Sequence, residues 1–247
     1  MGLKDLFGGF SAEARAKKQF DKAVGKLVSR NYQHEDRMFV IEQLGNLDTP
    51  EATAALFRRW DMTSDKGRED IAEKEFLSEV LVGKGIAMVS HLREHNDRSL
   101  NITWPIQVLR RVVGPEQVVD ELLRVLKTEQ DRIASFKPEK KLRLLELIAD
   151  YRDDERVAGG ILPSLDDFDA DVRYETARLL GQIGDEVART PLLDRLADPE
   201  EDSLRVKQAV LEALHEAAWK VVDRKDELGD LGDKYRIGPK GNLIVAD

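Results

Sequence analysis

Apolar residues recur at helical spacing along most of the chain, in pairs of short runs separated by turn residues. One run covers 34–45, and a second, 52–60, follows Thr49 and Pro50. Positions three and four residues apart share one face of an α-helix, so each run predicts a helix with one buried face. Thr49 suits the N-cap and Pro50 the first helical position. The pattern predicts helical hairpins, each too apolar on one face to stand alone.

The same two-helix pattern returns along the chain. It predicts further helices at 20–27, 71–80, 86–95, 106–112, 118–126, 142–148, 157–165, 172–183, 187–196 and 203–222. Breaks are expected at 83–85, 114–116, 153–155 and 184–185. Aligned on the breaks, the second helices begin at intervals of roughly thirty to forty residues, the irregular period of a helical repeat array. These aligned starts are Ala52, Ile86, Val118, Val157 and Val187.

The two ends of the chain differ from the middle. Residues 1–19 combine apolar and basic side chains and predict an amphipathic, flexible segment, with peripheral membrane contact as an open alternative. The repeat array is expected over 20–222. The last part, 223–247, reads as an acidic linker and a β-hairpin, because two β-prone runs flank a Gly-Pro-Lys-Gly-Asn turn. This hairpin either caps the last repeat or adds a strand to a partner.

The clearest copy of the repeat lies at 169–198, DADVRYETARLLGQIGDEVARTPLLDRLAD. Asp169 or Asp171 is placed to cap the first helix, and Gly184-Asp185 separates it from the second. This order of parts resembles a bacterial HEAT repeat of the short type also seen in phycobilisome-lyase-like proteins. The resemblance implies an all-α fold, a right-handed α-α superhelix (HEAT-like solenoid), here with a small C-terminal β-hairpin. It also implies a binding scaffold and leaves the partner unnamed.

Composition narrows the range of functions. The formal net charge is −9, which opposes a general affinity for nucleic acid phosphates or anionic lipids. The absence of cysteine excludes disulfides and thiolate zinc sites. No apolar run is long enough to span a membrane and no signal peptide is evident, so a cytoplasmic location is expected.

Basic residues gather late in the second helices of the hairpins, which line the concave side of such solenoids. Arg59 and Arg195 belong to this set. The strip predicts a groove for a protein with an acidic surface. Nucleic-acid binding, as in DNA glycosylases with HEAT-like repeats, is an alternative, and so is simple complementation of helix dipoles. The predicted partner-binding residues are Arg58, Trp60, His91, Arg93, Arg124 and Lys127. The tryptophans are also read as core fillers.

Two histidine patterns raise metal chemistry as an alternative. His91, Glu94 and His95 match H-x-x-E-H, in which two histidines hold zinc and the glutamate activates water, but no signature supplies a third protein ligand. His34-Glu35 and His215-Glu216 resemble the iron-binding pairs of deoxyhypusine hydroxylases, which are HEAT-repeat enzymes, but lie out of register with the repeat. The sequence therefore predicts a non-enzymatic protein-binding scaffold without metal or cofactor.

Overall fold

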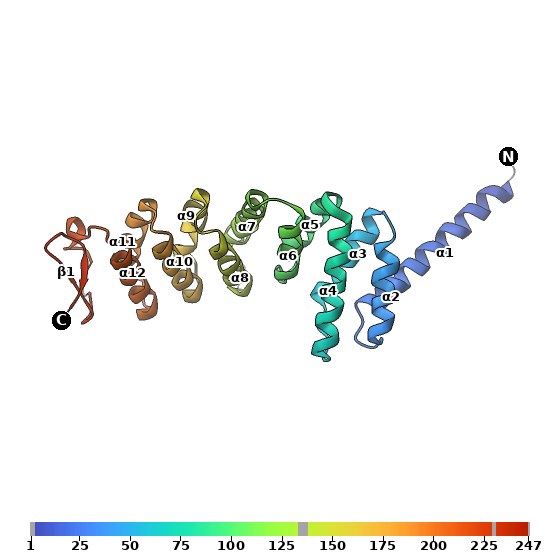
Figure 1. Ribbon diagram of the computed structural model, residues 1–247, viewed down its shortest axis with the longest axis horizontal. Coiled ribbons are helices and arrows are strands. Elements are labelled where there is room, and N and C mark those ends of the chain that lie inside the picture. The colour runs from blue at the N-terminus through green and yellow to red at the C-terminus, as the bar shows by residue number, and fades with distance from the viewer. Residues whose placement is uncertain (1–2, 133–137, 229–230, 247) are drawn as a thin grey trace. The chain divides into compact units, whose positions relative to one another are not determined.

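The computed structural model describes residues 3–132, 138–228 and 231–246, with the backbone alone described up to residue 11. The chain forms two compact units, 1–114 and 115–247, whose helices are coloured from blue to red along the chain in Figure 1. They are called unit 1 and unit 2 below. The division of the sequence into a leading segment, one array and a tail stays a prediction.

Unit 1 consists of helices in the order that the pattern predicts. The elements are α1 (Leu3–Leu27), α2 (His34–Gly45), α3 (Pro50–Asp61), α4 (Gly67–Lys84), the 3₁₀ turn η1 (Gly85–Met88), α5 (Val89–Arg98) and α6 (Thr103–Val112). The first helices of successive hairpins, α2, α4 and α6, pack side by side, and α3 packs against α5. The helix predicted from residue 20 starts earlier, since its backbone is already helical at Leu3, and residues 12–19 are exposed.

Unit 2 repeats this arrangement and ends in a two-stranded sheet. The described elements are α7 (Pro115–Gln130), α8 (Pro138–Ile148), η2 (Ala149–Tyr151), α9 (Glu155–Ile161), η3 (Leu162–Asp166), α10 (Ala170–Ile183), η4 (Glu186–Ala188), α11 (Arg189–Ala197), α12 (Leu204–Glu216), η5 (Val222–Arg224), β1 (Tyr235–Ile237) and β2 (Leu243–Val245). Helix α8 packs against α10, and α10 packs against α12. The strands are antiparallel, with Tyr235 opposite Val245. The predicted all-α, HEAT-like fold with a small C-terminal hairpin is confirmed.

The C-terminal hairpin packs on α12. The Nδ1 atom of His215 lies 3.0 Å from the carbonyl oxygen of Leu243, and the rings of His215 and Tyr235 are 5.3 Å apart. Leu243 is fully buried. The hairpin thus covers apolar surface at the end of the described helices of unit 2, as a cap does.

Local signals in the sequence explain most helix boundaries. The hydroxyl of Thr49 accepts a hydrogen bond from the backbone N–H of Ala52, and the carboxylate of Asp169 accepts from the first turn of α10. Gly184 ends α10 in the left-handed conformation, where a side chain would be strained. Ile86 and Val187 were expected at buried starts of second helices, but both are at least half exposed. Each lies in a 3₁₀ turn, η1 or η4, whose tighter winding changes the face that it presents.

A buried cluster of charges joins α2, α3 and α4. The carboxylate of Glu73 is fully buried and accepts hydrogen bonds from Arg37 at 2.8 Å and Arg59 at 2.7 Å, and it lies 2.9 Å from Nδ1 of His34. Arg59 also donates to Asp70, which pairs with Lys74. Buried charges are tolerated only when paired and hydrogen-bonded, so this cluster fixes how the α2–α3 hairpin meets the next helix.

Unit 2 contains the same arrangement in its α10–α11 hairpin. Arg173 of α10 makes two hydrogen bonds to the buried carboxylate of Glu201, at 2.7 and 2.8 Å, and Arg195 of α11 lies 3.7 Å from it. In both units a first-helix arginine and a second-helix arginine, at the same sequence spacing, meet a glutamate that follows the hairpin: Glu73 lies in α4, and Glu201 lies in the loop before α12. In both units this Arg–Glu–Arg cluster therefore joins a hairpin to the segment that follows it.

Because of the Arg–Glu–Arg clusters, the stability of the fold depends on pH in the acid range. Burial raises the pKa of Glu73 and of Glu201, but the hydrogen bonds from their arginine partners outweigh it and hold both pKa values below the ordinary 4.5. A carboxylate whose pKa is lower in the folded state than in the unfolded state contributes stability that is fully present at pH values above the unfolded-state pKa. This contribution is lost as the pH falls through the folded-state pKa. We expect the free energy of unfolding, measured by urea titration, to fall steeply below pH 4.5. A Glu73→Gln variant should lose less over this range; an identical acid slope would contradict this assignment.

Candidate functional site

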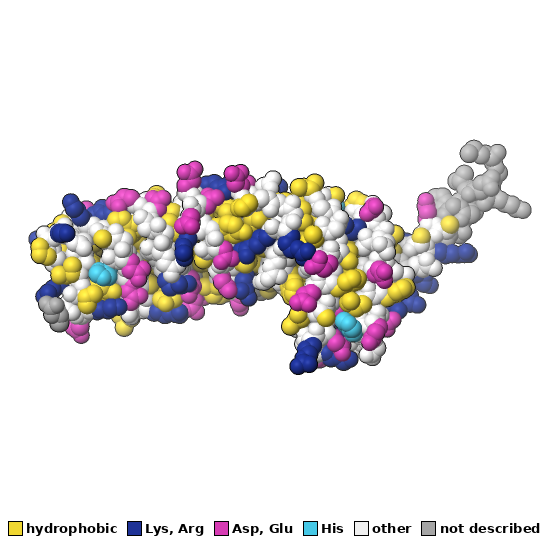
Figure 2. Space-filling view, viewed as in Figure 1, with side chains coloured by type: hydrophobic (Ala, Val, Ile, Leu, Met, Phe, Trp, Pro, Cys, Tyr) yellow, Lys and Arg dark blue, Asp and Glu magenta, His cyan; other side chains and the backbone are white. Residues whose placement is uncertain are grey.

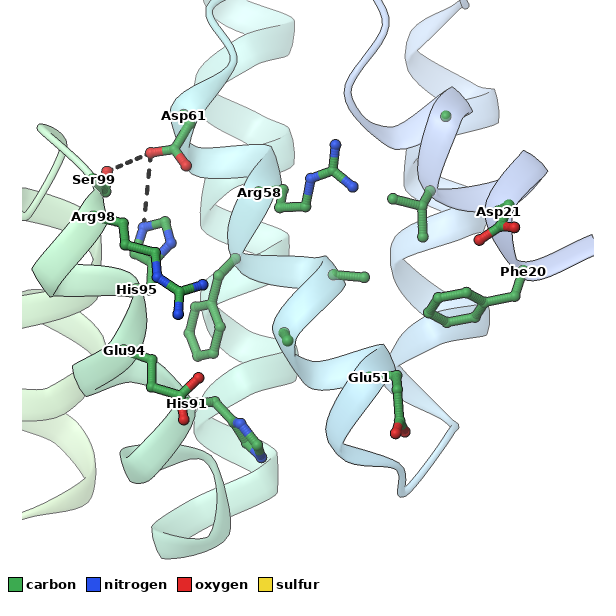
Figure 3. A pocket seen from close by; sticks show the side chains of 15 residues that line it. Phe20, Asp21, Glu51, Arg58, Asp61, His91, Glu94, His95, Arg98 and Ser99 are labelled. Atoms are coloured by element: carbon green, nitrogen blue, oxygen red, sulfur yellow. Dashed lines mark hydrogen bonds and ion pairs between the residues drawn. The ribbon is translucent and has the colours of Figure 1, made fainter. Parts of the chain in front are cut away.

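Unit 1 contains a groove of about 660 Å³ between α1, α3 and α5, called the unit 1 groove below. Side chains of α5 at His91, Glu94, His95 and Arg98 form one wall, because these positions follow the helical period. The opposite wall comes from Phe20 and Asp21 of α1, as Figure 3 shows. The groove therefore lies between the first helix of the unit, α1, and the second helices of its hairpins, α3 and α5.

The floor of the groove is made by α3, where small side chains leave room. Ala54 and Ala55 line it together with Gly25 of α1. Phe57 of α3 also lines the groove, whereas the opposite face of α3 carries residues that are buried in the core, including Leu56 and Trp60. One helix thus anchors the hairpin with one face and opens the groove with the other.

His95 is held at one end of the groove. Its ring stacks on Phe57 with centroids 5.4 Å apart, and its Nε2 lies 3.8 Å from a carboxylate oxygen of Asp61. The hydroxyl of Ser99 donates to the same carboxylate. In Figure 3 His95 turns toward Asp61, whereas His91 points to the other end of the groove. The two histidines therefore do not converge on one point.

Metal binding by H-x-x-E-H finds no support in this geometry. Among the residues that the structure describes, no three His, Asp or Glu side chains are grouped as metal ligands. His34 and His215 have structural neighbours, Glu73 and the C-terminal hairpin respectively, and belong to different units. His34, His95 and His215 are thus placed among packing and ion-pair contacts, and His91 lines the unit 1 groove.

The charges along the groove are mixed, with more carboxylates than cations. The groove is lined by two arginines, Arg58 and Arg98, and by four acidic side chains, which are Asp21, Glu51, Asp61 and Glu94. A groove of this composition repels phosphates and acidic surfaces more than it attracts them. The sequence had suggested the opposite sign.

The structure separates the residues predicted to bind a partner. Arg58 and His91 line the unit 1 groove, and Arg93 is exposed on α5 but lies off the lining face. Trp60 is only 1% exposed, so its place as a partner contact is corrected to a core position. In unit 2, Arg124 makes two hydrogen bonds to Glu121, and Lys127 pairs with Asp131.

Two arginines of the predicted basic strip, Arg59 and Arg195, form ion pairs within the protein. Arg59 is fully buried in its Arg–Glu–Arg cluster, and Arg195 pairs with Asp166 and Asp198. The sequence register placed these arginines at equivalent points, but each uses its charge inside the protein. Figure 2 shows acidic and basic side chains interspersed on the face in view. Mixed charge of this kind weakens the nucleic-acid hypothesis.

The hairpins and the groove lined by second-position helices define a helical-repeat protein. Residues 172–198 match the family model described as the PBS lyase HEAT-like repeat, which confirms the resemblance seen in this stretch. The structure of human deoxyhypusine hydroxylase in complex with glycerol is similar to this chain, with 18% sequence identity, a TM-score of 0.29, and coverage of 84% of this chain and 88% of that chain. A comparison with curated proteins gave no match.

The prediction that the chain is not an enzyme is contradicted by this similarity, because the matched protein is an enzyme. At a TM-score of 0.29 the likeness carries no assignment of an activity to this chain. None of the described helices is long and apolar enough to cross a bilayer.

Proposed function

We propose that this chain is a helical-repeat scaffold that binds another protein in the unit 1 groove. The observation that supports this is the groove itself, in which charged and aromatic side chains of α1 and α5 stand over a floor of small residues on α3. Such a mixture suits protein recognition, where a few apolar anchors supply affinity and surrounding charges supply specificity. A cytoplasmic setting is proposed with it.

The excess of carboxylates favours a partner segment that carries lysine or arginine. Glu94 and Asp21 lie on opposite walls, and Asp61 lies at one end. Complementary charge speeds association and suppresses wrong partners. A basic segment therefore fits the groove better than the acidic surface that the sequence suggested.

Filling the groove should abolish partner binding. The Ala54→Trp variant places a large side chain on the floor at an exposed position, so the core stays intact. The matched control is Ala72→Trp, an equally small and exposed position on α4, away from the groove. We expect affinity capture from the native cytosol to retain the same protein with wild type and Ala72→Trp and to lose it with Ala54→Trp. Equal capture by both variants would rule out the groove.

Charge reversal tests the sign of the partner. With the captured partner purified, Glu94→Lys should weaken binding several-fold, chiefly through the association rate, and Arg58→Glu should leave it unchanged or strengthen it. Binding would be followed by surface plasmon resonance at two salt concentrations. The reverse order of the two variants would show an acidic partner and contradict the assignment of a basic one.

A further inference from the structure

Two large apolar side chains of unit 2 are unusually exposed. Phe168 is 92% exposed and Leu204 is 81% exposed, more than any other large apolar residue described. Phe168 precedes the capping residue of α10, and Leu204 is the first residue of α12. Single exposed apolar residues are common, so their significance depends on whether these two share a surface.

Both residues lie on one edge of unit 2, because α10 and α12 run parallel. Asp171 at the start of α10 forms a 2.6 Å ion pair with Arg205 at the start of α12. Near the other ends, a Cβ atom added to Gly181 would lie 2.7 Å from Ala213. Arg173 also bridges the two starts, since it donates to the carbonyl oxygen of Phe168 and to the carboxylate of Glu201.

The turn that carries Phe168 is held by buried ion pairs. Asp167 binds Lys141 at 2.6 Å, with both side chains almost completely buried, and it also accepts from the N–H of Asp169. Arg173 donates to the carbonyl oxygens of Asp167 and Phe168. A fixed turn presents the aromatic ring with little loss of entropy on binding, as interface anchors require.

The same edge is strongly acidic. The segments 166–171 and 198–202 at the starts of α10 and α12 contain eight carboxylates, the described ion pairs supply four cations, and Lys207 of α12 is a fifth. The paired cations are Lys141, Arg173, Arg195 and Arg205. The carboxylates are Asp166, Asp167, Asp169, Asp171, Asp198, Glu200, Glu201 and Asp202. The edge therefore keeps a net negative charge around the two apolar side chains.

We propose that this edge, defined by Phe168, Leu204 and the acidic loops beside them, is a second protein-binding surface. Its occupant is a basic amphipathic helix of a partner protein, whose apolar side chains meet Phe168 and Leu204 and whose lysines or arginines meet the surrounding carboxylates. Charge complementarity selects a basic partner over a neutral or acidic one. The surface lies wholly within unit 2 and does not depend on the unit 1 groove.

Binding of a defined peptide tests the proposal. The probe is a fluorescent helical peptide of leucine and lysine, about 16 residues long so that it can form a helix. We expect the full chain to bind it, as measured by fluorescence anisotropy, and to bind a leucine–glutamate peptide far more weakly. The double variant Phe168→Ser with Leu204→Ser should bind the basic peptide about tenfold less tightly or worse. The control Val187→Ser removes a half-exposed apolar side chain elsewhere in unit 2 and should bind as wild type does.

The charge requirement has its own control. Asp202→Lys should weaken peptide binding, whereas Asp226→Lys, at an exposed position outside the two loops, should not. Circular dichroism and the thermal midpoint confirm that each variant folds. Equal binding by the double variant and wild type would overturn the proposal, as would equal binding of the two peptides. If wild type self-associates and the double variant does not, the occupant of this surface is a second copy of the chain, which would also contradict the proposal. Ala54→Trp should leave this peptide binding unchanged, which separates this surface from the groove.

Discussion

The Glu73→Gln variant is expected to lose about 3–5 kcal/mol of its free energy of unfolding. The substitution keeps the shape of the side chain but removes the negative charge that Arg37 and Arg59 share inside unit 1. Both guanidinium groups are almost completely buried, so water cannot replace the lost partner. Urea unfolding followed by circular dichroism measures the loss, and hydrogen exchange should show it as faster exchange in α2, α3 and α4.

The matched control for this experiment is Glu79→Gln on the same helix. Glu79 also makes two hydrogen bonds to an arginine, Arg111, at 2.7 and 2.8 Å, but both side chains are exposed. An exposed ion pair contributes little to stability, because solvent screens the charges and two long side chains lose conformational freedom. Equal losses in the two variants would mean that the buried Arg–Glu–Arg cluster does not hold unit 1 together.

The Gly181→Ala variant is expected to destabilise unit 2 by about 1–3 kcal/mol, although alanine favours a helix more than glycine does. The added Cβ atom would lie 2.7 Å from both the Cα and the Cβ atoms of Ala213. The backbone of α12 would have to move, because no flexible side chain is there to yield. Thermal unfolding by calorimetry would detect the loss as a lower midpoint.

Gly160→Ala is the comparison that isolates this effect. A Cβ atom there would also meet a neighbour at 2.7 Å, but that neighbour is the end of the Leu123 side chain, which can change rotamer. The gain in helix propensity should then leave the stability unchanged or slightly higher. A larger loss for Gly160→Ala than for Gly181→Ala would contradict the close backbone contact between α10 and α12.

Most of the fold follows from local patterns in the sequence. Helix starts such as Thr49-Pro50 and stops such as Gly184 depend on a few neighbouring residues, so they can be read without a structure. The 3₁₀ turns at Ile86 and Val187 could not, since a short change of winding leaves no periodic signal. The helical backbone before residue 20 was missed because a mixture of glycine, apolar and basic residues was read as flexible.

The candidate site could be predicted only in part. Arg58 and His91 were found from their positions in second helices, and the spacing of His91, His95 and Arg98 could have identified the lining face of α5. Arg59 was placed in the groove, but it is one residue from Arg58 and lies on the buried side of the helix. The wall from α1 depends on packing between elements distant in sequence, which local patterns do not contain.

The Arg–Glu–Arg clusters determine where this protein can be shortened. A chain cut after the α10–α11 hairpin would retain Arg173 and Arg195 but lose Glu201, which lies beyond that hairpin. The same holds for a cut after α3, which would remove Glu73 and leave Arg37 and Arg59 without their carboxylate. The exchangeable module is therefore a hairpin together with the glutamate that follows it, and deletions or grafts made at hairpin boundaries alone should fold poorly.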